Sequence, residues 1–151
     1  MTLRRVVVDA SVALKWVFGE DDSDTAEALL DLDLVAPDFL MLECANAIWS
    51  RVRGGYISPA DAQTALMALA AVPMILVPTS ELAAAALDLA LPLGHPAYDC
   101  AYLALAQREA VPLVTADRRF AAAVRQSSTL AGNLLLLTDL PQALTGSGRQ
   151  S

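Results

Sequence analysis

Four acidic residues stand within apolar sequence at widely separated places in the chain: Asp9, Glu43, Asp99 and Asp117. Carboxylates brought into one crevice repel one another, and they cannot all ionise unless a cation lies among them. Hard oxygen ligands with open coordination positions suit Mg²⁺ or Mn²⁺. An ion held in this way lowers the pKa of a bound water and neutralises charge on a phosphate. These residue types therefore predict a site for a divalent metal ion and chemistry assisted by that ion.

Two of the four acids closely follow predicted strands. Asp9 comes directly after three consecutive valines, residues 6–8, which are typical of a short buried strand. Asp117 stands at the end of a strand predicted over residues 111–114. Ligands of an open parallel sheet bind at the carboxyl ends of its strands, so both acids are expected to face that crevice.

The other two acids lie near the starts of predicted helices. Glu43 falls in a helix over residues 39–53, and Asp99 falls in the first turn of a helix over residues 97–110. Helices that follow strands begin at the rim where those strands end, so all four acids can converge. We expect Asp9 and Asp99 to bind the principal ion directly, and the other two acids to hold a second ion or bound waters.

The rest of the chain alternates short apolar strands with helices. Further strands are predicted over residues 34–36, 74–77 and 134–137, and further helices over residues 13–18, 25–34, 59–71, 80–91 and 118–126. This alternation predicts an α/β fold with a central parallel sheet of about five strands flanked by helices. The length fits a single domain over residues 1–144, and the polar tail 145–151 is expected to be disordered.

Each acid also has a purely structural explanation. Asp9 and Asp117 could cap the helices that follow them, Asp99 could stabilise the N-terminus of its own helix, and Glu43 could pair with an arginine. Asp38 is predicted to cap the helix over residues 39–53. Spacing alone leaves these explanations open. Under them, however, four acids with unrelated structural roles would all lie at the same edge of the sheet by coincidence.

Three polar residues lie close in sequence to the acids. Ser11 and Thr115 each stand two residues from a site acid, where a hydroxyl can orient a carboxylate or a bound water, or can simply satisfy a turn. Asn46 lies one helical turn after Glu43 and could hydrogen-bond the cluster or fill a helix position. The only histidine, His95, lies in a Gly-His-Pro turn and is expected to be a surface loop residue.

Composition limits the class of protein. The net charge of −7 argues against nucleic-acid binding, unless bound divalent ions reverse the local field. Lys15, Arg118 and Arg119 lie near the acids in sequence and could receive an RNA backbone or remain solvated. No segment reaches the roughly 20 apolar residues of a membrane span. A cytoplasmic protein is expected, with Cys44 and Cys100 as core residues.

Four segments together carry a resemblance to a known family. They are Val-Val-Val-Asp9-Ala-Ser11 followed by Ala-Leu-Lys-Trp, Glu43-Cys-Ala-Asn46-Ala-Ile, Tyr98-Asp99-Cys-Ala-Tyr-Leu-Ala-Leu-Ala, and Leu-Val-Thr115-Ala-Asp117-Arg-Arg-Phe. Taken in order they span nearly the whole chain. The sequence resembles the PIN-domain ribonucleases, and within them the VapC-type toxins of type II toxin–antitoxin pairs.

The resemblance implies a PIN-like fold and a set of functional residues. The four acids match the family's acidic quartet, Thr115 matches the hydroxyl beside the last acid, and Asn46 matches a frequent companion. The family implies endoribonuclease activity that depends on Mg²⁺ or Mn²⁺, with RNA as the substrate. It also implies a homodimer, inhibited by a cognate VapB-like antitoxin whose C-terminal segment inserts near the acidic pocket.

Two functions from other classes remain open from the residues alone. An Asp-based phosphoryl-transfer domain also places an Asp after its first strand. A phosphatase of that kind, however, needs a second Asp where Ser11 stands, and a receiver needs a lysine after a late strand, whereas Lys15 is the only lysine. A non-catalytic partner-binding module is compatible with the 56% hydrophobic composition, and partner binding without metal affinity would favour it.

Overall fold

The computed structural model describes residues 3–140 and contains a five-stranded sheet in the order β3-β2-β1-β4-β5. The strands are β1 (Arg5–Val8), β2 (Asp33–Pro37), β3 (Ile75–Val77), β4 (Leu113–Thr115) and β5 (Leu134–Leu136). All neighbouring strands pair in parallel, so the predicted α/β class is confirmed. The strand order reverses between β1 and β4, where such a sheet opens its ligand crevice. The predicted disordered tail, 145–151, lies outside the described residues.

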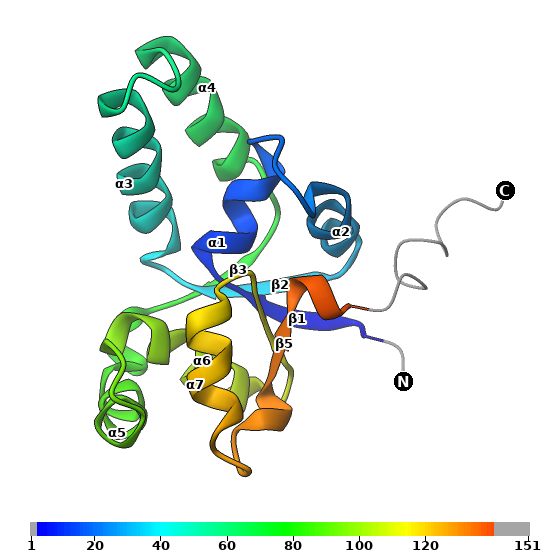
Figure 1. Cartoon of the computed structure of the whole chain (residues 1–151), viewed down its shortest axis with the longest axis vertical. Coiled ribbons are helices and arrows are strands. Elements are labelled where there is room, and N and C mark those ends of the chain that lie inside the picture. The colour runs from blue at the N-terminus through cyan, green and yellow to red at the C-terminus, as the bar shows by residue number, and fades with distance from the viewer. Residues whose placement is uncertain (1–2, 141–151) are drawn as a thin grey trace, which may run out of the picture.

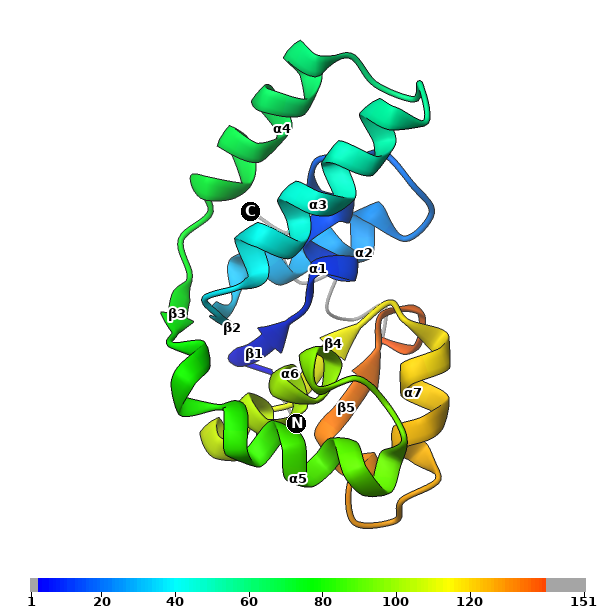
Figure 2. The same ribbon diagram turned by 90° about the vertical axis from the view of Figure 1, so that its left-hand side faces the viewer.

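The helices of the described part are α1 (Ala10–Ala13), α2 (Ser23–Ala28), α3 (Leu40–Arg53), α4 (Pro59–Ala70), α5 (Ala83–Leu93), α6 (Ala97–Glu109) and α7 (Arg118–Arg125). Helices α3 and α4 lie side by side and extend away from the sheet, at the opposite end of the molecule from α5 and α7 (Figures 1 and 2). Helix α6 packs against β1, β2 and β4. No helix among residues 3–140 has the length and apolar character needed to cross a membrane.

The central strand β1 is buried on both faces. Successive side chains of a strand point to opposite sides of the sheet. Val7 therefore joins a core formed with α3, α6 and α7, whereas Val6 and Val8 join a second core formed with α1 and α2. All three valines are fully buried. This explains why an unbroken apolar run, rather than a polar–apolar alternation, forms the central parallel strand.

The helix predicted over residues 25–34 is too long. Helix α2 ends at Ala28 and is followed by a single 3-10 turn, and β2 begins at Asp33. Asp33 pairs with Arg5 of β1, so strand pairing in the sheet overrides the helical pattern of the local sequence.

Three other helix ends also differ from the prediction. Helix α1 starts earlier than expected, directly after Asp9, because the Asp9 carboxylate caps it. The prediction that Asp38 caps α3 is wrong. Its carboxylate instead accepts hydrogen bonds from the hydroxyl and the backbone N–H of Thr79, the latter at 3.0 Å, and so fastens the start of α3 to the segment after β3. Helix α5 continues through Pro92 and ends at Gly94, whose left-handed conformation (φ +66°) terminates it.

The two cysteines are core residues, as predicted. Cys44 on α3 and Cys100 on α6 are free thiols buried in the same core as Val7. Burial raises the pKa of Cys44 to about 12 and that of Cys100 to about 11. Both thiols therefore stay protonated at neutral pH and unreactive as nucleophiles.

Candidate active site

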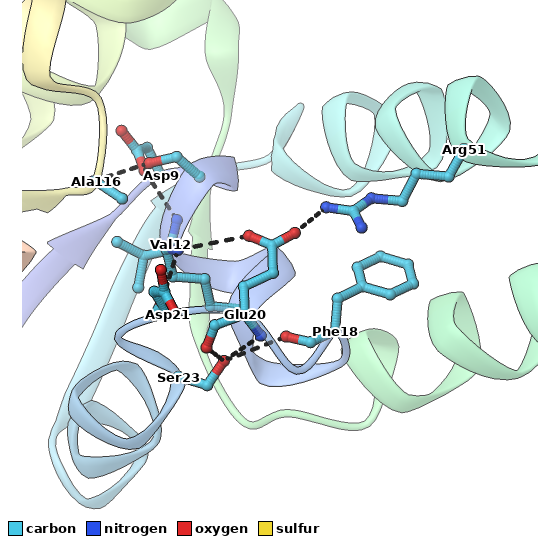
Figure 3. Close-up of polar contacts among 10 residues, drawn as sticks. Asp9, Val12, Phe18, Glu20, Asp21, Ser23, Arg51 and Ala116 are labelled. Atoms are coloured by element: carbon cyan, nitrogen blue, oxygen red, sulfur yellow. Dashed lines mark hydrogen bonds and ion pairs between the residues drawn. The ribbon is translucent and has the colours of Figure 1, made fainter. Parts of the chain in front are cut away.

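Asp9 lies at the carboxyl end of β1, where α1 begins (Figure 3). Its Oδ1 accepts hydrogen bonds from the Ser11 hydroxyl at 2.5 Å and from the Val12 backbone N–H at 3.3 Å, and its Oδ2 accepts one from the Thr115 hydroxyl of β4. The carboxylate is thus held from two elements. Only 9% of Asp9 is exposed, and burial raises its pKa from 3.8 to about 6 although the hydrogen bonds act to lower it.

The hydroxyls of Ser11 and Thr115 form a polar bridge between the ends of β1 and β4. Their oxygens lie 3.4 Å apart. The Ser11 Oγ also accepts the backbone N–H of Ala116 at 3.0 Å, and the Thr115 Oγ1 accepts that of Asp117 at 3.1 Å. The structure therefore places both hydroxyls against Asp9, at the point where the strand order reverses.

Asp117 lies just beyond β4 and caps α7. Its Oδ1 accepts the backbone N–H groups of Arg119 at 3.0 Å and Phe120 at 3.1 Å. Asp9 caps α1 in a similar way, so the capping explanation holds for both acids. Capping does not remove Asp117 from the site, because its charge raises the pKa of Asp99.

Glu43 lies in the first turn of α3, and its half-buried carboxyl group is within electrostatic reach of two other site acids. Burial is the main cause that raises its pKa to about 7, and the charges of Asp9 and Asp99 raise it further. The nearby hydroxyl of Tyr102 acts in the opposite direction. Within residues 3–140 no arginine pairs with Glu43, so that alternative explanation finds no support there.

Asp99 lies in the first turn of α6, with its Oδ2 atom 3.8 Å from Nδ1 of His95. Burial and the charge of Asp117 raise the pKa of Asp99, whereas His95 lowers it. His95 lies in the loop between α5 and α6, as predicted, but it is less exposed than expected. Its side chain is only 18% exposed, because its ring packs 5.3 Å from the buried ring of Phe120 while its nitrogen faces the acid.

The four acids form one connected electrostatic group. The charge of Asp99 raises the pKa of Asp9 and of Glu43. The charge of Asp9 also raises the pKa of Glu43, and the charge of Asp117 raises that of Asp99. Within residues 3–140, no group of three or more His, Cys, Asp or Glu side chains is arranged so that it could hold a metal ion. Mg²⁺, however, is usually bound through one or two carboxylates and keeps several waters. Oxygen donors that repel one another therefore fit Mg²⁺ or Mn²⁺, and ligation by all four acids stays a prediction.

Comparison with known proteins identifies the fold. The family model of the PIN domain matches residues 6–126. The chain belongs to the PIN domain family. It is 33% identical over 121 residues to Ribonuclease VapC3 of Pyrobaculum aerophilum, an alignment that covers 78% of this chain and 92% of that protein. The crystal structure of PAE2754 from Pyrobaculum aerophilum shares the fold with a TM-score of 0.65 at 23% identity, over 95% of this chain and 98% of that one. The predicted PIN-like fold and family resemblance are therefore confirmed.

The remaining polar residues predicted for this PIN domain are exposed and lie close in sequence to Glu43 or Asp117. Asn46 is exposed on α3, and no hydrogen bond joins it to the acids within residues 3–140. Arg118 and Arg119 are exposed in the first turn of α7, directly after Asp117. The structure thus leaves these three side chains accessible to a substrate without fixing them to the acids.

Lys15 is already engaged within the PIN domain. Its Nζ lies 3.5 Å from the Glu20 carboxylate and donates a hydrogen bond to the carbonyl of Asp21 at 2.9 Å. The same carboxylate pairs with Arg51 near the end of α3, whose guanidinium also lies 4.1 Å from the centre of the Phe18 ring. This cluster fastens the loop after α1 to α3 and holds the Lys15 ammonium group in place.

Two residues of the site were not predicted from the sequence. His95 lies four residues before Asp99, and Tyr102 lies three residues after it, so both share a side with that acid. This spacing is visible in the sequence, but Tyr102 also fits the apolar face of a helix and His95 also fits an exposed turn, so neither stands out as a site residue. Only the packing of Phe39 and Phe120 around them shows that they belong to the site.

Proposed function

We propose that this PIN domain is a Mg²⁺- or Mn²⁺-dependent endoribonuclease that hydrolyses RNA phosphodiester bonds and acts as the toxin of a toxin–antitoxin pair. The similarity to Ribonuclease VapC3 supports the activity, since it extends over most of both chains. The observation that carries the proposal is the group of mutually repelling acids at the carboxyl ends of β1 and β4. Such a group is unfavourable by itself and favourable around a divalent cation.

The acids are proposed to divide the work. Asp9 and Asp99 hold the principal ion, and Glu43 and Asp117 hold a second ion or ordered waters. When bound, the ion supplies charge stabilisation at the phosphorus and lowers the pKa of water. The hydroxyls on either side of Asp9 keep its carboxylate in one orientation. Asn46, exposed one turn after Glu43, is available to contact the substrate.

Arginines beside the site are proposed to receive the RNA backbone. A polyanionic substrate needs cations near the acids, because the chain as a whole is negative. Arg118 and Arg119 are exposed beside Asp117 and have no ion-pair partner among residues 3–140. Lys15 contributes less to RNA binding, because Glu20 and the Asp21 carbonyl already engage its ammonium group.

Exposed apolar side chains support the proposed protein partners. Ile75 and Leu76 of the edge strand β3 are 51% and 43% exposed, and Leu87 and Leu91 of α5 are 53% and 73% exposed. Leu87 and Leu91 lie one helical turn apart, so they share one side of α5, and exposed apolar residues that lie together are typical of interaction surfaces. We propose that they contribute to a homodimer, that a cognate VapB-like antitoxin inhibits the toxin near the acidic pocket, and that the protein acts in the cytoplasm.

The proposal is tested by incubating a mixed RNA pool with purified protein, freed of any antitoxin, in Mg²⁺, in Mn²⁺ and in chelator. Asp99→Asn removes a proposed ligand at nearly constant shape. Asp88→Asn makes the same chemical change at an exposed residue of α5 that does not belong to the acidic group, and it serves as the matched control. We expect cleavage by the wild type and by Asp88→Asn with either metal, and none with chelator or with Asp99→Asn.

Three results would contradict this function. Cleavage that survives both chelator and Asp99→Asn would show that the acids do not act through a metal. Absence of cleavage together with absence of Mn²⁺ binding in calorimetry would favour a non-catalytic partner-binding module. Covalent labelling of Asp9 by a small phosphodonor would instead indicate an Asp-based phosphoryl-transfer domain.

A further inference from the structure

The hydroxyl of Tyr102 is the one buried side-chain oxygen or nitrogen without a hydrogen-bond partner in the described part of the chain. Tyr102 lies in the middle of α6 and is 1% exposed. Leaving a buried hydroxyl without a hydrogen-bond partner destabilises the folded state. Because native proteins pair nearly all such groups, this one calls for a functional explanation.

The hydroxyl of Tyr102 lies near two of the acids, Glu43 and Asp9. The residue lies one helical turn after Asp99 on α6. Its ring meets the ring of Phe39 edge to face, with centroids 5.2 Å apart, and Glu43 follows Phe39 by one turn. Of the charged groups near the phenol, Glu43 acts on it most strongly and Asp9 next. The Glu43 side chain is long and only half-buried, so its carboxylate can move to meet the hydroxyl.

We propose that Tyr102 is a positioning residue, whose hydroxyl donates a hydrogen bond to the Glu43 carboxylate and holds it in the orientation that binds a divalent ion. This inference rests on the metal-dependent function proposed above. Donors that orient a ligating carboxylate contribute to metal affinity, and their loss typically weakens binding 10- to 100-fold. Asp9 has its own hydroxyl donors in Ser11 and Thr115, and Tyr102 is the corresponding donor for Glu43.

Replacing Tyr102 by Phe removes the hydroxyl and keeps the packing against Phe39. Mn²⁺ affinity, measured by calorimetry, should fall about 10-fold in Tyr102→Phe. The unfolding midpoint of the metal-free variant should stay equal or rise, because no hydrogen bond of the metal-free protein is lost. Tyr98→Phe is the matched control, since Tyr98 lies on the same helix, is 70% exposed, and also contacts Phe39. Its Mn²⁺ affinity should equal that of the wild type.

Repeating Tyr102→Phe in a Glu43→Asp variant separates positioning of Glu43 by Tyr102 from a general effect of Tyr102 on packing. Glu43→Asp keeps a carboxylate but shortens the side chain by one methylene, which withdraws it from Tyr102. In this background, Tyr102→Phe should change the Mn²⁺ affinity less than twofold. An equal 10-fold loss in both backgrounds, or an unchanged affinity in Tyr102→Phe alone, would overturn the positioning role. The proposed function would survive either result, whereas a wild type that binds no Mn²⁺ would overturn both.

Discussion

The acidic group makes the stability of the metal-free protein depend on pH. Folding raises the pKa of Asp9 from 3.8 to about 6 and that of Glu43 from 4.5 to about 7. Between these values the folded state binds more protons than the unfolded chain. The free energy of unfolding therefore falls as pH rises, because deprotonation is easier in the unfolded state. The stabilising contribution is complete below about pH 4 and is lost above about pH 7.

The size of this loss follows from the shifts. One pKa unit corresponds to about 1.4 kcal/mol, so the fully buried Asp9 contributes about 3 kcal/mol. Glu43 is half-buried, and solvent screening reduces its contribution to about 1–2 kcal/mol. The two acids share their mutual repulsion, so their contributions overlap. We expect the free energy of unfolding to fall by about 3–4 kcal/mol between pH 4.5 and 7.5.

Urea denaturation in the presence of chelator measures this loss across the pH range. Asp9→Asn should leave a decrease of only about 1 kcal/mol, since it removes one buried charge and relieves Glu43. Asp88→Asn should retain the full decrease. Glu20 does not confuse the result, because Arg51 lowers its pKa and its contribution is already complete above about pH 4.5. Stability that is constant or rises over this range in the wild type would refute the reasoning, as would an unchanged slope in Asp9→Asn.

Three further outcomes follow from the same contacts. In urea denaturation, Thr115→Val should lower the free energy of unfolding by about 2–3 kcal/mol, because it removes a buried donor to Asp9, and Thr115→Ser should restore most of that loss. Arg51→Ala breaks a partly exposed ion pair with Glu20, so a loss above about 2 kcal/mol in the same assay would contradict our account. In sedimentation velocity, Leu87→Asp should convert the proposed dimer to a monomer, and a persistent dimer would place the interface elsewhere.

The order of the fold is predictable where local pattern and tertiary context agree. The β1 valines can form only a buried strand, and Ser58 with Pro59 marks the start of α4, where the Ser58 Oγ accepts the Asp61 backbone N–H at 3.0 Å. The end of α2 was not predictable, because the pairing of Asp33 with Arg5 depends on the sheet rather than on neighbouring residues. Pairing partners distant in sequence leave no local signal.

In the candidate site, too, some residues could be predicted from the sequence and others could not. The placement of Asp9 and Asp117 follows from strand ends alone, and the structure places both at the predicted rim. The pairing of His95 with Asp99 could not be predicted, because it depends on a contact between a turn and α6. The burial of His95 depends in turn on packing against the ring of Phe120. A Gly-His-Pro sequence shows neither, because the same three residues occur in exposed turns. The orphan hydroxyl of Tyr102 is equally invisible in an apolar helix pattern.

Helix capping and metal binding do not compete for these acids, because a carboxylate has two oxygens. Asp117 caps α7 through Oδ1, which leaves Oδ2 without a hydrogen bond among residues 3–140. Asp9 accepts hydrogen bonds on both oxygens and is therefore held in place by the fold itself. Glu43 has no such fixed donors, and burial together with the charges of Asp9 and Asp99 raises its pKa. A divalent ion would thus meet one rigid carboxylate and adjust the others around it, so variants of Ser11 and Thr115 should weaken metal binding through Asp9.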